Sequence, residues 1–436
     1  MKNFSKYGVQ IPEILLPKNI DLKTWAVIAC DQYTQDKDYW QKAAETAGSA
    51  PSTLNLIFPE VYLNEDDRDA RIGKIKRTMR EYLSQDIFNC GEECIYIERK
   101  TEYGRTRRGL VLAVDLEKYE WKPGSKALIR ATEATVPERI PPRMKIRNGA
   151  ALELPHIMLL ANDPDDVLVG GAEKLAKENI PLYDGDLMMN AGHLTGWRVK
   201  GEKAEKMLEG ALETLYKNGT DSDGNTFLFA VGDGNHSLAT AKAVWDEHKK
   251  LLPDSEKETS PVRYALVEVV NIYDKGLTFE PIHRVIFNQD PKKLIDFVQK
   301  KLGGEIKAFD SEKELESFVA DKSAEGARYG FITKDGLCVL ETEIKDLAIA
   351  ALQPVLDEYL DKNSKDKKND IDYIHGTDEV LRLGKKDNAL SILLPPIAKD
   401  SFFATINGRG PLPRKSFSMG EASEKRFYVE ARKLFL

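Results

Sequence analysis

Cysteine is scarce in this sequence. Only Cys30, Cys90, Cys94 and Cys338 occur among 436 residues, and just one pair of them is closely spaced. A single pair without a second lacks the spacing of a structural metal site. So few cysteines in so long a chain predict buried free thiols in a reducing cytoplasm.

Long apolar runs and an excess of positive charge are also missing. No apolar stretch approaches the roughly 18 residues of a membrane span, and the N-terminal stretch has neither the apolar core nor the cleavage site of a signal peptide. The net charge is −7 and the pI about 5.7, which argues against a protein that coats nucleic acid. This net charge does not exclude a local basic cleft. We therefore expect a cytoplasmic protein with no membrane or nucleic-acid partner.

What the chain does contain is typical of a globular α/β protein. Hydrophobic residues make up 42% and charged residues 31%, and the length suffices for two or three domains with cores of their own. The alternation of helical and strand-like segments predicts four stretches. They are an N-terminal α/β region at 1–125, a central region at 126–290, a small α/β sandwich at 291–385 and a C-terminal segment at 386–436 that returns to the central region.

The stretch from Thr226 to Leu251 has the clearest pattern. Phe227–Val231 is a short apolar run that predicts a buried strand, and the next six residues, Gly232–Ser237, have no apolar side chain. Apolar residues then recur at helical spacing with charged residues between them. The stretch therefore predicts a strand, a glycine turn and a helix.

Such a turn can bind an anion, because the first N–H groups of a helix have no internal partner and carry partial positive charge. Asp233 can hold Mg²⁺ or take a proton, and His236 can act as a donor near its own pKa. Gly234, Asn235 and Ser237 complete the candidate phosphate site. The alternative is a tight turn whose Asn or Ser caps the helix.

A second candidate, Asp31, follows the strand-like run Trp25–Cys30. A carboxylate just past a strand end lies where α/β folds place chemistry. The alternative is that Asp31 caps the next helix.

Residues 126–162 combine prolines with clustered Arg and Glu. We expect an extended, fixed loop with no regular helix, because it contains Pro137, Pro141 and Pro142. Arginine clusters suit phosphate or carboxylate binding, which makes Arg143 and Glu133 candidates. The alternative is a surface loop with mutual ion pairs.

Two later segments complete the candidates. His283 and Arg284 follow a glycine turn, and Lys415 and Ser416 follow a turn stiffened by prolines. A core histidine beside a surface arginine explains the first pair as well as a binding site does. A solvated turn is the alternative for the second pair.

Together these segments resemble a bacterial family, domain of unknown function 1015 (DUF1015). Its D-G-H-H-R-like turn corresponds to Asp233–Ser237, and its H-E-R-T-like segment to Thr132–Thr135, followed by Arg143. Its G-L-x-x-x-P-x-H-R segment corresponds to Gly276–Arg284, and its P-x-K-S segment to Pro413–Ser416. The chain departs from the pattern at three positions, where it has Thr132, Asn235 and Ser237.

The turn is also similar to one in the ParB/sulfiredoxin-like fold, which includes kinases of free serine. The resemblance implies a ParB/sulfiredoxin-like core at 126–290 and phosphoryl transfer to a small metabolite, free L-serine above all, with pyrophosphate or a nucleotide as donor and Mg²⁺ as cofactor. The sequence has no Walker A motif, so short turns would hold the donor. The alternatives are a nucleotide- or phosphate-binding regulatory or partner-binding protein, and a phosphatase.

On this hypothesis the turn at Asp233–Ser237 holds the donor, with the metal at Asp233 and with His236 as a further catalytic group. Glu133 is the base for the acceptor hydroxyl. Positive groups neutralise the developing charge. These groups are Arg143, Arg284 and Lys415, with Asp31, His283 and Ser416 as further contacts.

Overall fold

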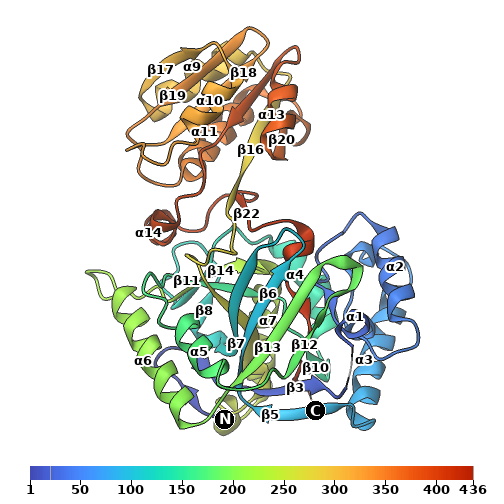
Figure 1. Ribbon diagram of the computed structural model, residues 1–436. Helices are drawn as coiled ribbons and strands as arrows, with labels where there is room; N and C mark the ends of the chain where they lie inside the picture. Colours follow the sequence, from blue (N-terminus) through green and yellow to red (C-terminus); the bar gives the residue numbers. More distant parts are fainter. Residues whose placement is uncertain (20, 436) are drawn as a thin grey trace. The chain divides into compact units, whose positions relative to one another are not determined.

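The structure is a computed structural model that describes residues 1–19 and 21–435 (Figure 1). The chain divides into two compact units. Unit 1 comprises residues 1–277 and 421–436, and unit 2 comprises residues 278–420. Each unit contains a β-sheet with helices, mixed in unit 1 and antiparallel in unit 2, so the predicted α/β class is confirmed.

Unit 1 is built on a large mixed sheet. In order across the sheet, its strands are β12 (Tyr183–Asp186), β13 (Gly192–Val199), β6 (Cys94–Thr101), β7 (Thr106–Asp115), β15 (Tyr264–Asn271), β11 (Met158–Ala161), β14 (Phe229–Asp233), β9 (Ile129–Ala131) and β8 (Tyr119–Glu120). β2 (Val9–Gln10) pairs with β7, and β1 (Asn3–Phe4) pairs with β2. β11 runs parallel to β15 and antiparallel to β14.

Helices cover both faces of this sheet. Alternate residues of a strand point to opposite faces, and both faces of this sheet carry apolar side chains that need cover. In β6, Tyr96 packs into one apolar core, and its neighbours Ile95 and Ile97 pack into the other. The first core is completed by α5 (Val169–Ala176), α6 (Glu202–Asn218) and α7 (Asn235–His248). The second is completed by α2 (Lys37–Ala47) and α3 (Arg68–Ser84). The shorter elements of unit 1 are α1 (Leu22–Trp25), β3 (Glu13–Pro17), β4 (Val27–Ile28), β5 (Phe88–Glu92), β10 (Leu152–Glu153) and α8 (Asp254–Lys257).

The sheet joins two stretches that the sequence analysis separates at residue 125. β7 lies before this boundary and β15 after it, yet the two strands pair from Tyr264 opposite Asp115 to Val269 opposite Leu110. Hydrophobic periodicity predicts where a strand lies and does not predict which strand it pairs with. The boundary predicted at residue 125 therefore divides a single sheet. Residues 1–125 and most of 126–290 therefore share one folding unit.

The proline-rich loop is helical in part, which corrects the prediction of an extended segment. A short 3-10 turn at Pro137–Arg139 leads into α4 (Ile140–Arg147). Pro141 and Pro142 lie in the first turn of α4, where backbone N–H groups need no partner inside the helix. The prolines therefore start this helix.

Residues 421–435, called the C-terminal segment from here on, close unit 1, whereas residues 386–420 of the predicted segment belong to unit 2. β23 (Phe427–Tyr428) pairs with β4, and β24 (Arg432–Lys433) pairs with β10. Just before β23, the buried Arg426 donates hydrogen bonds to Glu268, to Glu430 and, over 2.9 Å, to the carbonyl oxygen of Pro155. Losing one partner of a buried ion pair is costly, so these contacts fix the segment firmly.

Unit 2 is a smaller α/β sandwich. Its sheet has the order β17 (Glu305–Phe309), β19 (Gly336–Glu341), β18 (Arg328–Thr333), β21 (Ala389–Leu393), β16 (Glu280–Phe287) and β20 (Ile371–His375), and β22 (Phe417–Ser418) also pairs with β16. The helices of the unit are α9 (Pro291–Leu302), α10 (Glu312–Val319), α11 (Ala348–Asn363), α12 (Lys367–Asp370), α13 (Thr377–Gly384) and α14 (Lys399–Arg409). Among the described residues, the structure shows no helix with the length and apolar character that a bilayer crossing requires.

Candidate functional site

The predicted strand, turn and helix are present at the end of β14. Gly234 has a φ of +83°, and a Cβ atom there would lie 3.0 Å from Cγ1 of Ile157, so the position needs glycine. α7 begins at Asn235 without a side-chain cap from Gly234. The first N–H groups of the helix are thus left to other partners, as anion binding requires.

Asp233 holds the last position of β14, immediately before this helix start. Its Oδ2 atom is buried and accepts no hydrogen bond from the described residues, and Nζ of Lys425 lies 3.8 Å away. Burial raises the pKa of Asp233, the Asp31 carboxylate raises it further, and Lys425 opposes the rise. Such an unsatisfied carboxylate oxygen next to a cation suits a ligand that brings its own charge or metal.

A histidine that the sequence analysis missed lies beside this turn. His156 Nε2 is 2.7 Å from the hydroxyl oxygen of Ser237 in the first turn of α7, and its Nδ1 is 2.8 Å from the hydroxyl of Tyr428. The same Nε2 lies 3.9 Å from a carboxylate oxygen of Asp31. Asp31, Ser237 and the C-terminal segment therefore meet at one imidazole ring.

Arg143, on α4, donates from Nε to Glu60 over 2.8 Å. Burial raises the pKa of Glu60, Arg143 opposes this rise, and the charges of Asp31 and His156 also act on Glu60. Arg143 therefore belongs to the same charged cluster, where Glu60 holds its guanidinium.

The segment with Glu133 contacts the start of α7. The backbone N–H of Thr132 donates to Oδ1 of Asn235 over 3.3 Å, and the N–H of Val136 donates to Nε2 of His236 over 3.2 Å. In the sequence, Glu133 lies between Thr132 and Val136, the two residues that make these contacts. Unit 1 thus gathers eight predicted residues around one helix start: Asp31, Glu133, Arg143, Asp233, Gly234, Asn235, His236 and Ser237.

Four further residues of this cluster were not predicted, namely Glu60, His156, Lys425 and Tyr428. For His156 the sequence offered one signal, because it stands just before a buried strand. Lys425 and Tyr428 belong to the C-terminal segment, which reaches the cluster through the pairing of β23 with β4 and the contacts of Arg426. No local pattern announces that pairing.

The remaining predicted residues belong to unit 2, where three of them, His283, Arg284 and Ser416, are buried and Lys415 is exposed. Arg284 is buried and donates to Gln353 over 2.7 Å, while Ser416 is buried and donates to the carbonyl oxygen of Pro413. Lys415 lies 4.8 Å from the ring centroid of Tyr373, and the Arg284 guanidinium lies 4.6 Å from the same centroid. The two predicted segments are neighbours, yet the burial of Arg284 and Ser416 argues against their predicted phosphate contacts.

His283 is also buried, and its Nδ1 accepts a hydrogen bond from the N–H of Leu394 over 3.0 Å. Burial, followed by the neighbouring charge of Arg284, lowers its pKa from 6.5 to about 4. Between these values the unfolded chain binds a proton that folded unit 2 does not bind. We expect the stability of unit 2 to fall by up to about 3 kcal/mol as the pH falls through this window.

Urea unfolding of the full chain at several pH values measures this loss. In the His283→Gln variant the amide oxygen can still accept from Leu394, and the pH dependence should flatten between about pH 6.5 and 4. An unchanged slope in this variant would assign the pH dependence to other groups.

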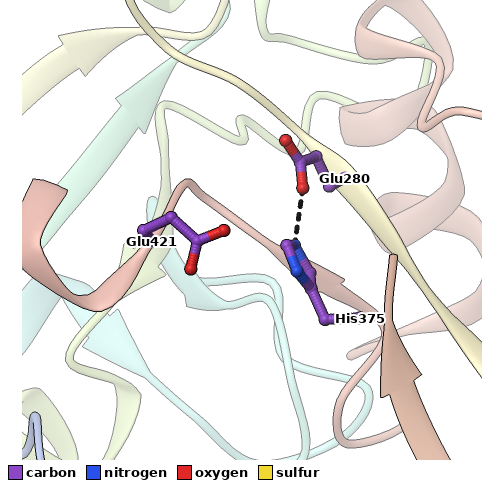
Figure 2. A group of neighbouring side chains, drawn as sticks. All are labelled: Glu280, His375 and Glu421. Atoms are coloured by element: carbon purple, nitrogen blue, oxygen red, sulfur yellow. Dashed lines mark ion pairs between the residues drawn. The ribbon is translucent and has the colours of Figure 1, made fainter. Parts of the chain in front are cut away.

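In unit 2, an ion pair joins the edge strand β20 to β16. His375 Nε2 lies 2.6 Å from a carboxylate oxygen of Glu280 (Figure 2). Both side chains are partly or fully exposed, so the pair contributes little to stability. Glu421, the third side chain drawn, belongs to unit 1, where it caps the short turn Ala422–Glu424.

Solved structures similar to this chain include proteins of low sequence identity. A mutant free serine kinase in complex with AMP is 12% identical, and the match covers 74% of this chain and 92% of that one with a TM-score of 0.38. A conserved hypothetical protein from Pyrococcus furiosus is 13% identical, with coverages of 74% and 95% and a TM-score of 0.34. SbnI with a C-terminal truncation, from Staphylococcus aureus, is 9% identical, with coverages of 71% and 83% and a TM-score of 0.34.

No protein of curated function matches the chain. The sequence profile of DUF1015, described as a protein of unknown function, matches residues 15–361. This range includes the strand, the glycine turn and the helix around which the cluster of unit 1 is built. The chain belongs to the DUF1015 family, as its motifs predict.

Proposed function

We propose that the chain is a phosphotransferase that moves a phosphoryl group from pyrophosphate or a nucleotide to the hydroxyl of a small metabolite. The observation that carries the proposal is the carboxylate of Asp233, whose Oδ2 lacks a hydrogen bond within the described residues at the open start of α7. Phosphoryl transfer asks chiefly for positioning and charge neutralisation. Both are available at this turn.

Positive groups of unit 1 would bind the donor. The N–H groups in the first turn of α7 point their partial positive charge at a phosphate placed there, and Lys425 adds a full charge 3.8 Å from Asp233. Arg143 contributes a further cation from α4, oriented by Glu60. The proposal therefore assigns charge neutralisation to Lys425 and Arg143, in place of Arg284 and Lys415.

The donor set at Asp233 fits Mg²⁺, which prefers oxygen ligands and often binds through one or two carboxylates together with substrate phosphates. Bound there, the ion would neutralise charge on the donor phosphates. Asp31 would contact the acceptor, and Glu133 would take the proton of its hydroxyl.

Free L-serine is the acceptor that the family resemblance implies. The test is an assay of the purified chain with L-serine, Mg²⁺ and, in separate reactions, pyrophosphate, ADP or ATP, with phosphoserine as the product measured. We expect phosphoserine with at least one donor. Phosphate release without serine would indicate a phosphatase, and donor binding without any turnover would indicate a regulatory protein; either result would overturn the proposal.

A further inference from the structure

Ser237 and His156 have the geometry of a nucleophile and its general base. The hydroxyl oxygen of Ser237 lies 2.7 Å from Nε2 of His156, within the distance that proton transfer needs. Ser237 is partly exposed, whereas His156 is buried beneath it. A ligand at the start of α7 can therefore reach the hydroxyl, while the base stays shielded from water.

The imidazole is oriented from its other side. The Tyr428 hydroxyl lies 2.8 Å from Nδ1 of His156, and its oxygen also accepts from the backbone N–H of Cys30 over 3.2 Å. Burial raises the pKa of Tyr428 well above its usual value, so the phenol stays neutral. With the His156 proton on Nδ1 and donated to Tyr428, the lone pair of Nε2 faces Ser237. A nucleophile, a base and a group that orients the base are thus aligned.

Ser237 also stands where a phosphoryl group would arrive. It lies in the first turn of α7, where the partial positive charge of the helix N-terminus stabilises negative charge, and within the same short stretch as Asp233. A phosphoryl group bound at this turn would therefore meet a hydroxyl that is paired with a base.

We propose that Ser237 is a nucleophile that carries the phosphoryl group covalently between donor and acceptor. In the first step Oγ of Ser237 bonds to the terminal phosphorus, its proton passes to Nε2 of His156, and the bond from phosphorus to the leaving phosphate or nucleotide breaks. In the second step the acceptor hydroxyl bonds to phosphorus and its proton passes to Glu133. The bond from phosphorus to Ser237 breaks, and Oγ regains the proton held on His156.

This inference rests on the proposed phosphotransferase function, and it predicts a phosphorylated enzyme when the acceptor is withheld. The full chain is incubated with Mg²⁺ and pyrophosphate or ATP, without serine, and intact mass and peptide mapping are recorded. We expect one added phosphoryl group, on Ser237, that disappears when serine is added. The Ser237→Ala and His156→Gln variants should lose it, and turnover should fall by about a thousand-fold or more.

Thr240→Ala is the matched control, because its hydroxyl lies about one turn further along α7 and donates to the carbonyl oxygen of His236 over 2.7 Å. This variant should be phosphorylated like the unmodified chain. A fluorophosphonate probe, which labels activated serine hydroxyls, gives a readout independent of the donor. It should label Ser237, and the His156→Gln variant should lose this label.

The outcomes separate the two proposals. Phosphoserine formation by an enzyme that is never phosphorylated on Ser237, with turnover retained in Ser237→Ala, overturns the covalent step and leaves the function standing. Phosphorylation of Ser237 without transfer to serine overturns the acceptor and leaves the covalent step standing. If Ser237 takes up neither a phosphoryl group nor the probe, the covalent step is wrong whatever the acceptor.

Discussion

Replacement of Asp233 by asparagine is expected to lower kcat/KM for phosphoryl transfer by about a thousand-fold or more. The substitution keeps the shape of the side chain and removes the charge that would bind Mg²⁺ next to the donor phosphates. Asp233 ends β14, and its Oδ2 accepts no hydrogen bond within the described residues, so the substitution breaks no hydrogen bond of this atom and removes the charge that faces Nζ of Lys425 3.8 Å away. We therefore expect a folded protein with little activity, measured by phosphoserine formation and by thermal unfolding.

The control for this substitution is Asp223→Asn, which changes an exposed carboxylate in the loop before β14. It should leave kcat/KM unchanged. Activity in Asp233→Asn within a few-fold of the unmodified chain would remove Asp233 from the site.

The second large effect is expected from Lys425→Met, which removes the cation 3.8 Å from Asp233. We expect kcat/KM to fall by about a hundred- to a thousand-fold, because the donor phosphates lose a neutralising charge. Lys425 also lowers the pKa of Asp233, which burial and Asp31 raise. Without Lys425 this pKa rises further, so the acidic limb of the pH profile of kcat/KM should move to higher pH.

Lys433→Met tests whether the effect is local. Lys433 belongs to the same C-terminal segment but pairs with Glu13, 3.5 Å away. The pH profile of kcat/KM of the Lys433→Met variant should match that of the unmodified chain. An acidic limb that stays in place in Lys425→Met would show that Lys425 does not act on the ionisation that limits activity.

Local patterns predicted the strand, the glycine turn and the helix at the centre of the candidate site. The apolar run, the glycines and the helical spacing around Asp233 all lie within one short stretch, where the structure has β14, a glycine turn and α7. The prediction failed at α4, because proline is unfavourable in the interior of a helix but fits well in its first turn. Position within the helix decides the effect of proline, and composition alone does not supply that position.

Contacts between distant segments were beyond the sequence. Lys425 reaches Asp233 because Arg426 anchors the C-terminal segment to Glu268 and to the carbonyl oxygen of Pro155. That second contact also fixes the residue before His156. The residues of such a buried network do not recur at a regular spacing in the sequence. The sequence therefore could not predict that His156 lies at the site.

Sequence also left two interpretations of His283 and Arg284 open. The structure favours the core interpretation for His283, which accepts from Leu394 inside unit 2. Arg284 differs from both interpretations, because it too is buried and donates to Gln353. An arginine that finds an internal acceptor cannot be told from a phosphate-binding one by its position in a motif.

A crystal structure of the full chain with Mg²⁺ and pyrophosphate tests the central claim most directly. The account predicts pyrophosphate at the start of α7, with its oxygens in contact with the first N–H groups of the helix and with Lys425, and with the metal on Asp233. Pyrophosphate bound elsewhere on the chain, with this turn left without it, would contradict the account.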